Sequence, residues 1–296
     1  MNAFQHDNNR PDHSIIHHAR LLSDVNRIES FKQAIEKCVS PNSTVVDIGS
    51  GTGILAAYAA RKTKKTVYAI EYYKFGINLA TKIIDNNYTY SNISLVNNSS
   101  YATSIQDPLD ILITETIGQI GPEENIVEIC YDFKRRHPSI KKLIPSKLNI
   151  YAEFIYSLKG IQFLESIKND YFSASLPDYQ FQSINMDLHN TLASIVMQTD
   201  ISDAKAIQDR IMLAEYDLGQ TNYSTFSVSI PIQKNYNDAL IHLYFEANLG
   251  ENISLSSRFT EQNHWKHSIF PVAHGKSNVN IEYTSGSEFI NITWKD

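Results

Sequence analysis

The stretch Val45-Val46-Asp47-Ile48-Gly49-Ser50-Gly51-Thr52-Gly53-Ile54-Leu55 decides the fold. It contains a short apolar run with an acid, then three glycines at alternate positions, then an apolar segment typical of a helix. We interpret this order as a strand, a tight turn and a helix start. Glycines in such a turn let a ligand lie close to the backbone because no Cβ stands in the way. The first N–H groups of the following helix are also open to a ligand.

Two kinds of nucleotide site compete for this turn. A dinucleotide fold has the pattern G-x-G-x-x-G, but Ile54 stands where its third glycine would be. The acid comes two residues before the first glycine, and this D-x-G-x-G-x-G order resembles the S-adenosylmethionine loop of class I methyltransferases. A second strand is expected at 67–70 and ends in Glu71, where a carboxylate is placed to accept from ribose hydroxyls. The site residues assigned on this basis are Asp47, Gly49, Gly51, Gly53 and Glu71.

Composition narrows the classes of function. The chain has 296 residues, 42% of them hydrophobic, and a net charge of −6, so it can bury a sizeable core and shows no basic patch for nucleic acid. Cys38 and Cys130 are the only cysteines, which favours neither a disulfide framework nor a thiolate zinc site. The longest apolar run, 54–60, is too short to span a bilayer. The polar first residues do not resemble a signal peptide, and we expect a cytoplasmic protein.

Hydrophobic periodicity divides the chain into three parts. Residues 14–39 have the 3–4 spacing of an amphipathic helix, most simply two helices with a bend. Residues 44–146 alternate strands and helices, which predicts a parallel sheet, whereas the part after Pro145 is rich in short β-forming segments and predicts antiparallel β structure. Residues 157–215 interrupt this second half as a less regular, partly helical insertion. In the parallel part, the expected strands are 44–48, 66–70, 93–96, 109–113 and 142–144, and the expected helices are 53–62, 74–86 and 124–136.

A second group of polar residues follows the strand expected at 109–113. Glu115 begins the loop after this strand, at the edge where open α/β sheets bind ligands, and Glu124 lies nine positions later (124 − 115). Two carboxylates on one loop can converge on a planar cation that has several N–H donors. The alternative for Glu124 is an ordinary glutamate in the first turn of a helix, favoured by the helix dipole. Glu115 is harder to explain that way, because a buried acid without a partner is costly.

These motifs together resemble the protein arginine methyltransferases along most of the chain. The glycine loop, Glu71 and the two glutamates match the family's cofactor site and double-glutamate loop. The segment 18–27 resembles its N-terminal helix, Pro145 its junction proline, usually cis, and His264-Trp265 its threonine-histidine-tryptophan loop. The resemblance implies a class I methyltransferase (Rossmann-like) domain followed by a mostly antiparallel β-barrel with a helical dimerisation arm. The implied boundaries are 1–40 for helices closing over the cofactor, 41–145 for the Rossmann-like domain, and 146–296 for the barrel, with the arm at about 157–200.

The resemblance also assigns roles to further residues. Arg27 would hold the carboxylate of S-adenosylmethionine, with the alternative of a solvated helix arginine. His264 would pair with Asp24 across the catalytic site, with the alternative of a histidine packed in a barrel loop. Ser100 and Tyr101 would lie in the cofactor site, the tyrosine about where an adenine-facing acid is common. No framework of carboxylates accompanies the histidines, so we expect no metal.

Departures from the family pattern concern the acceptor rather than the cofactor. The paired Tyr-Phe signature of the N-terminal helix is missing, Thr116-Ile117 replaces a bulkier pair, and Gln119 replaces an aromatic residue. We therefore expect an S-adenosylmethionine-dependent N-methyltransferase, with S-adenosylhomocysteine as product, acting on a guanidinium of free, peptide or protein arginine or on a related cation. A small-molecule acceptor other than arginine and a non-catalytic cofactor-binding protein remain open. The expected partners are a cationic acceptor and a second copy of the chain, but neither nucleic acid nor membrane.

Overall fold

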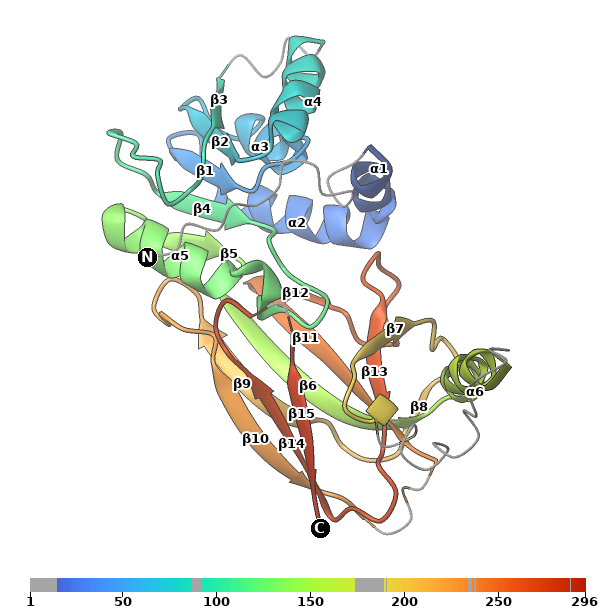
Figure 1. Cartoon of the computed structure of the whole chain (residues 1–296). Coiled ribbons are helices and arrows are strands. Elements are labelled where there is room, and N and C mark those ends of the chain that lie inside the picture. The colour runs from blue at the N-terminus through green and yellow to red at the C-terminus, as the bar shows by residue number, and fades with distance from the viewer. Residues whose placement is uncertain are drawn as a thin grey trace.

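The computed structural model describes residues 15–86, 92–173, 189, 191–233, 236, 238–287 and 289–296. Figure 1 shows two stacked halves: a sheet flanked by helices, and below it a set of long curled antiparallel strands. Two N-terminal helices lie beside the junction between the halves. No described helix has the length and apolar character needed to cross a membrane.

The N-terminal helices are α1 (Ile15–Ser23) and α2 (Val25–Cys38). Asp24 separates them and caps α2, since its side chain accepts a hydrogen bond from the Arg27 amide. One face of α2 buries Phe31 and Ile35 completely, and this helix contacts elements of both halves. The predicted pair of helices with a bend is confirmed.

The upper half is a parallel sheet in the order β3-β2-β1-β4-β5. The order reverses between β1 and β4, the switch point at which open α/β sheets bind ligands. In register, Ile48 lies opposite Ile70 on β2 and Thr114 on β4, so three strands end together beneath the glycine loop. The strands are β1 (Val45–Ile48), β2 (Val67–Glu71), β3 (Ile93–Asn97), β4 (Ile111–Thr114) and β5 (Lys142–Ile144), and the helices are α3 (Ile54–Ala60), α4 (Lys74–Asp85) and α5 (Ile126–Arg136).

The lower half begins after a cis peptide bond between Ile144 and Pro145. Its longest strands, β6 (Lys147–Tyr156) and β11 (Leu240–Gly250), pair with each other over nearly their whole length. They belong to a curled sheet in the order β7-β13-β11-β6-β8, with β12 joined to β11 and β9 joined to β6, and a smaller sheet runs β10-β14-β15. The other strands are β7 (Met197–Thr199), β8 (Lys205–Ala206), β9 (Ile211–Asp217), β10 (Phe226–Pro231), β12 (Ile253–Ser256), β13 (His267–Pro271), β14 (Asn278–Tyr283) and β15 (Asn291–Lys295).

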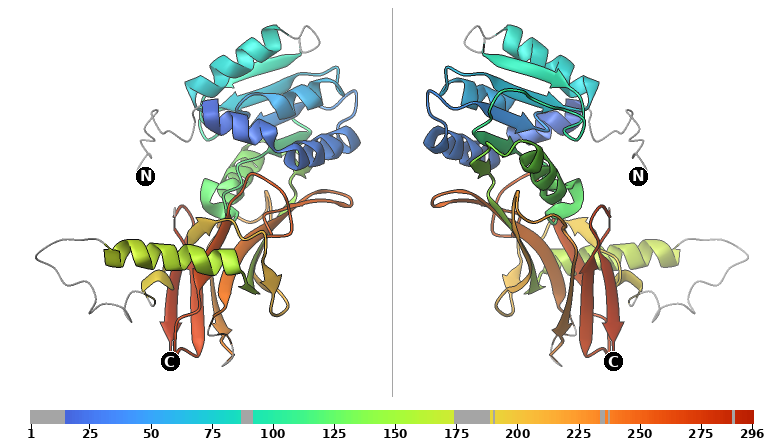
Figure 2. Two further views of the ribbon diagram at one scale, coloured as in Figure 1. Left: turned by 90° about the vertical axis from the view of Figure 1, so that its right-hand side faces the viewer. Right: turned by 90° about the vertical axis from the view of Figure 1, so that its left-hand side faces the viewer.

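The segment expected to interrupt the barrel is shorter than predicted. Residues 211–215, placed by sequence in the insertion at 157–215, belong to β9, which pairs with β6. The pairing passes over Leu213 of β9, because Ile150 lies opposite Ala214 and Tyr151 lies opposite Met212. Such a bulge obscures the simple alternation from which strands are recognised. Helix α6 (Leu158–Ser173) projects from the barrel where the arm was expected (Figure 2). Residues 174–188 of the expected arm lie outside the described residues.

The two halves share one hydrophobic core, with members on both sides of residue 145. A carboxylate on α5 adds a polar link: Glu128 accepts hydrogen bonds from the Ser224 amide (2.9 Å), the Ser224 hydroxyl (2.6 Å) and the Ser285 hydroxyl. A smaller cluster, which includes Leu164 and Leu240, packs the base of α6 on the barrel. The junction between the halves, where the candidate site lies, is therefore well packed.

Candidate active site

The glycine loop has the shape predicted from its sequence. Gly49, Gly51 and Gly53 adopt φ values of 69°, 53° and 76°, which residues with a Cβ rarely adopt. The Gly49 amide donates to the carbonyl of Ile70 at 2.9 Å, which binds the loop to the neighbouring strand. A Cβ on Gly49 would lie 2.7 Å from the side chain of Thr116, so the backbone passes close to the loop that follows β4.

Two acidic residues at the ends of neighbouring strands, Asp47 of β1 and Glu71 of β2, lie next to the glycine loop. Asp47 is 1% exposed; its Oδ2 accepts from the Ala56 amide at 3.0 Å, whereas its Oδ1 has no hydrogen-bond partner. Burial raises the pKa of Asp47 to about 8, and the nearby Glu71 and Glu115 carboxylates add to this rise. Glu71 accepts from the Gly51 amide at 2.8 Å and the Tyr73 amide at 2.7 Å, and burial raises its pKa. Its contact with a ribose stays a prediction.

Helix α1 covers the glycine loop from above. His18 is 8% exposed and stacks on Phe75, with ring centroids 5.7 Å apart. A Cβ on Gly51 would lie 3.4 Å from Cε1 of His18. Burial lowers the pKa of this histidine. The sequence alone did not predict that His18 would lie over the loop.

Asp24 joins the N-terminal helices to the barrel. Its Oδ1 accepts from the Arg27 amide at 2.9 Å, and its Oδ2 accepts from both the backbone amide and Nδ1 of His264 at 2.8 Å. Burial alone would raise the pKa of Asp24, but the hydrogen bonds from His264 and Arg27 lower it below its usual value. The predicted contact between Asp24 and His264 is confirmed, and its part in catalysis stays a prediction.

Arg27 and Glu115 form a buried ion pair that was not predicted. Their side chains are 5% and 10% exposed. The second terminal nitrogen of Arg27 donates to the carbonyl of Leu21 at 2.8 Å, while its buried Nε has no partner. The sequence assigned Arg27 to the cofactor and Glu115 to the acceptor, and it held no signal that these residues, 88 positions apart, would touch.

In the loop between β4 and α5, residues 115–125, the adjacent residues Glu123 and Glu124 point in different directions. Glu124 ends a short 3₁₀ turn (η3, Pro122–Glu124) and is exposed, so it precedes α5 rather than starting that helix as expected. Glu123 turns back into the loop and accepts from the amides of Ile120 and Gly121. Convergence of Glu115 and Glu124 on one cation stays a prediction.

The barrel holds the outer side of this loop. The indole nitrogen of Trp265, a residue only 3% exposed, donates to the carbonyl of Ile117 at 3.0 Å. Gln119 has both oxygens engaged: its carbonyl accepts from the Ser257 hydroxyl at 3.3 Å, and its side chain accepts from the Lys266 amide at 2.8 Å. Gln119 therefore helps to hold the loop 115–125 on the barrel. The sequence analysis noted only that Gln119 replaces an aromatic residue of the family and did not predict this role.

Ser100 and Tyr101, which were predicted to lie in the cofactor site, form part of the turn after β3. Tyr101 is 52% exposed, whereas Ser100 is 9% exposed. Arg136 donates to the carbonyls of Ser100 and Thr103, each at 2.6 Å. The contact of this arginine, in the last turn of α5, with the turn after β3 was not predicted from sequence, because basic residues are common at helix C-termini for other reasons.

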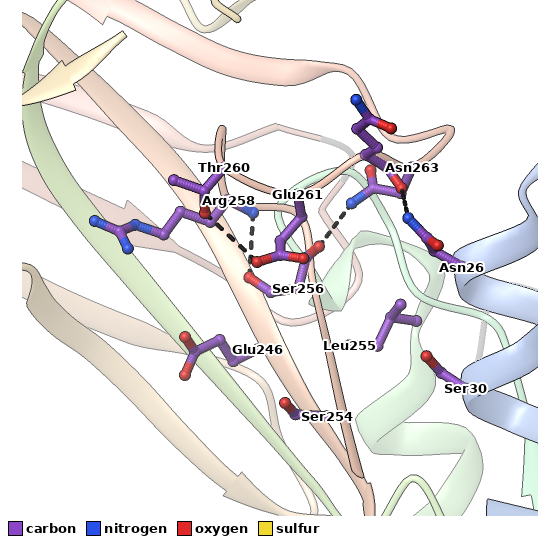
Figure 3. Close-up of a pocket in the computed structure, with 11 residues that line it drawn as sticks. Asn26, Ser30, Glu246, Ser254, Leu255, Ser256, Arg258, Thr260, Glu261 and Asn263 are labelled. Atoms are coloured by element: carbon purple, nitrogen blue, oxygen red, sulfur yellow. Dashed lines mark hydrogen bonds between the residues drawn. The ribbon is translucent and has the colours of Figure 1, made fainter. Parts of the chain in front are cut away.

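A polar pocket of about 190 Å³ opens beside the site (Figure 3). Two of its residues are chain neighbours of site residues, since Asn26 precedes Arg27 and Asn263 precedes His264. Asn26 donates to the carbonyl of Gln262 at 2.8 Å and so ties α2 to the rim. The remaining lining residues are Ser30, Glu246, Ser254, Leu255, Ser256, Arg258, Thr260 and Glu261.

Two polar atoms of the site that have no partner within the protein are consistent with a bound cofactor. They are Arg27 Nε and Asp47 Oδ1, and both are buried. Both residues were assigned to the cofactor, Asp47 from the glycine-loop motif and Arg27 from the resemblance to the family. Such atoms are expensive to bury unless something binds them. Within the described parts of the chain, no group of three histidine, cysteine or acidic side chains is placed to hold a metal ion.

The fold is that of a class I methyltransferase domain joined to an antiparallel β-barrel, the architecture of the protein arginine methyltransferases. A Trypanosoma brucei protein arginine methyltransferase 1 enzyme–prozyme heterotetrameric complex with AdoHcy superposes with a TM-score of 0.73 over 96% of this chain and all of that chain, at 15% identity. The expected class I methyltransferase domain followed by an antiparallel β-barrel and the resemblance to this family are confirmed, whereas the role of the arm in dimerisation stays a prediction. At such identity, the likeness concerns the fold.

Sequence comparisons agree with the fold. The family model for ribosomal protein L11 methyltransferase matches residues 31–128. An uncharacterized protein of Methanocaldococcus jannaschii is 31% identical over 52% of this chain, and an arginine N(omega)-methyltransferase of Streptomyces achromogenes is 22% identical over 86% of this chain and 70% of its own length. The chain spans 60% of the archaeal relative and 34–42% of several protein arginine N-methyltransferases of other organisms.

Proposed function

We propose that this protein is an S-adenosylmethionine-dependent N-methyltransferase whose acceptor is the guanidinium of free, peptide or protein arginine, or a related cation. The observation that carries the proposal is the ion pair of Arg27 with Glu115. A carboxylate that is 10% exposed, beside the glycine loop, already binds a guanidinium of the protein itself. Its surroundings therefore suit the planar fork of donors that a guanidinium presents.

The cofactor end of the proposal rests on residues around the glycine loop. The backbone at Gly49, Gly51 and Gly53 turns beneath the methionyl part of the ligand, Glu71 accepts from the ribose hydroxyls, and Arg27 Nε donates to the amino-acid carboxylate. When bound, the cofactor supplies an activated methyl group on a sulfonium. The protein's own contribution is orientation and charge compensation, effects worth several kcal/mol of an activation barrier.

The two glutamates of the loop would handle the acceptor. Glu115 and Glu124, by binding the guanidinium unequally, would keep electron density on the reacting nitrogen. A strong general base is not required, because the proton can leave after the nitrogen has reacted. The hydrogen bond between His264 and Asp24 would keep the N-terminal helices closed over both ligands.

The test is intact-mass analysis of candidate acceptors after incubation with the protein and S-adenosylmethionine. We expect a gain of one or more methyl groups on a guanidine, and a much smaller yield of methylated product with the Glu115→Gln variant. Free arginine, an arginine peptide, lysine and neutral or acidic compounds form the panel. Methylation of hydroxyl or carboxyl acceptors ahead of every guanidine would contradict the arginine assignment and leave the methyltransferase assignment in place.

A small or defined acceptor is favoured over a broad range of proteins. Gln119 is occupied by the Lys266 amide, so no aromatic face is offered to the acceptor at that position. The adjacent pocket, about 190 Å³, suits a small polar group. A cofactor-binding protein without catalysis remains the alternative, and cofactor binding without product across the whole panel would favour it.

We also propose a homodimer located in the cytoplasm. Leu158 at the start of α6 and Tyr156 just before it are 51% and 47% exposed, and exposed apolar side chains on a projecting helix suit a protein interface. The alternative is that the arm packs on its own barrel. Light scattering distinguishes them, because a mass near 33.6 kDa at micromolar concentration would contradict the dimer. Two free cysteines are consistent with a reducing compartment.

A further inference from the structure

Glu123 occupies the inside of the loop that carries Glu115 and Glu124. Its Oε1 accepts from the Ile120 amide at 2.9 Å and its Oε2 from the Gly121 amide at 2.7 Å. An ionised carboxylate only accepts hydrogen bonds, so it can satisfy two amides at once, and charge makes each bond stronger than a neutral one. The side chain of Glu123 thus closes the turn between Glu115 and Glu124, the two glutamates proposed to bind the methyl acceptor.

The opposite wall of this turn has no room for a side chain. A Cβ on Gly118 would lie 2.4 Å from Oε2 of Glu123 and 2.8 Å from its Cδ. The Gly118 amide also donates to the carbonyl of Gly121 at 2.9 Å, across the same turn. Glycine at 118 and glutamate at 123 are therefore sterically matched.

The outside of the loop is held by different groups. Trp265 donates to the Ile117 carbonyl at 3.0 Å, and the Tyr283 hydroxyl donates to the Pro122 carbonyl at 3.3 Å. These barrel contacts seat the two ends of the turn but leave the amides of Ile120 and Gly121 to Glu123. The position of the loop on the barrel and the shape of its turn thus depend on separate contacts.

We propose that Glu123 is the positioning residue of the acceptor loop: its carboxylate, closed on the Ile120 and Gly121 amides against Gly118, sets the spacing of Glu115 and Glu124. Glu123 itself does not touch the acceptor, because both of its oxygens are bound to the backbone. The proposal rests on the proposed function, since the spacing of the glutamates matters only if they bind a cationic acceptor.

Two substitutions disturb this contact from opposite sides. Glu123→Gln keeps the shape but turns an amide nitrogen, a donor, toward a backbone N–H, and Gly118→Ala pushes the carboxylate away. For each we expect kcat to fall tenfold or more and KM for the acceptor to rise, with Kd for S-adenosylmethionine changed less than twofold. Because both act on one contact, the double variant is expected to be no worse than the more impaired single variant.

A second readout requires no activity. The chain has two tryptophans, so a Trp294→Phe background leaves Trp265 as the only reporter of the loop. In that background we expect Glu123→Gln to shift Trp265 emission to longer wavelength and to increase quenching by acrylamide. Glu124→Gln is the matched control: it removes the same charge from the adjacent, exposed residue and should lower turnover without changing Trp265 emission.

The outcomes separate the two claims. If Glu123→Gln leaves both Trp265 emission and the acceptor KM as in the parent, or if the Gly118→Ala and Glu123→Gln effects simply add, the positioning role is wrong. If the parent protein methylates no cation, the proposed function fails, and the emission of Trp265 still decides whether Glu123 shapes the loop.

Discussion

Oδ2 of Asp24 accepts two hydrogen bonds from His264, one from the backbone amide and one from the ring, both 2.8 Å long. The same carboxylate caps α2 through the Arg27 amide. One residue between the two N-terminal helices therefore fixes both the start of α2 and its attachment to the barrel. Arg27, which contacts Glu115, is positioned by this cap, so the link to the barrel and the ion pair of the site depend on each other.

Asp24→Asn should weaken cofactor binding. The amide can replace only one of the two oxygens as an acceptor, so either the Arg27 amide or the His264 amide loses its partner. An unmatched buried donor costs about 1–3 kcal/mol, and we expect Kd for S-adenosylmethionine to rise about tenfold in calorimetry. Asp85→Asn, an exposed substitution at the end of α4, is the control. Unchanged affinity in Asp24→Asn would show that the helices close without this carboxylate.

Changes in the glycine loop should abolish cofactor binding. Valine at position 51 would place a side chain where the ligand must lie and would require a β-branched residue at φ 53°. Asp47→Ala removes the buried acid below the loop. Calorimetry should show no S-adenosylmethionine signal for Gly51→Val or Asp47→Ala, and no NAD signal for the parent protein. Binding of NAD without S-adenosylmethionine would contradict the assignment of the site.

The strand, turn and helix at 45–55 could be predicted because every determinant is local: the apolar run, the acid and the alternating glycines. The contact of His264 with Asp24 spans 240 positions and was predictable only through resemblance to a family. The pairing of Arg27 with Glu115 could not be predicted, because sequence gives each residue a role but not the direction of its side chain.

Sequence spacing also does not show which of the adjacent residues Glu123 and Glu124 turns into the loop. Both glutamates fall at the end of the same loop, and counting from Glu115 selects Glu124. Which one turns inward is decided by the backbone: Gly121 adopts φ 135°, and Gly118 leaves space for a carboxylate. The prediction that residues 211–215 belong to an irregular insertion was wrong for a similar reason. Their strand β9 pairs with β6, which is distant in sequence, and the pairing contains a bulge.

Loss of charge from the acceptor loop should slow turnover without affecting the cofactor. Glu115→Gln and Glu124→Gln each remove one carboxylate while nearly keeping its shape. A charged partner left unmatched costs about 2–5 kcal/mol, so we expect turnover on the true acceptor to fall roughly a hundredfold or more, unequally for the two residues. Steady-state kinetics and cofactor calorimetry measure this. Full turnover in either variant would remove that residue from the acceptor site.

Acid should destabilise the protein through a buried histidine of the barrel. His242 is fully buried with no hydrogen-bond partner on either ring nitrogen, and burial, with His267 and Arg258 nearby, holds its pKa well below 6.5. The folded state keeps this ring neutral, whereas the unfolded chain binds a proton below pH 6.5. Its contribution to stability is therefore complete above that pH and is lost as the pH falls, by up to about 1.4 kcal/mol per pH unit.

His242→Leu isolates this effect from the other histidines. Urea unfolding of the parent and the variant between pH 5 and 7.5 should give a smaller loss of unfolding free energy with acid in the variant. His274→Leu, a change at an exposed histidine, should keep the slope of the parent. Equal slopes in the parent and His242→Leu would show that His242 does not cause the acid sensitivity.

The pocket beside the site should favour acceptors with a second positive charge. Of the charged residues that line the pocket, Arg258 donates two hydrogen bonds of 2.9 and 2.6 Å to Glu153, and Glu246 is paired with Arg210. These charges are compensated, so the net charge of the lining comes from Glu261. An exposed charge pair contributes up to about 1 kcal/mol, which corresponds to about fivefold. For a guanidine that also carries an ammonium group, Glu261→Gln should raise KM by up to that factor, and more at low salt than at high salt. For a simple alkylguanidine, KM should be the same in Glu261→Gln and the parent.

Glu251→Gln at the β11–β12 turn is the matched control. If Glu261→Gln changed KM equally for both acceptors, the ammonium group of the acceptor would not be bound by Glu261.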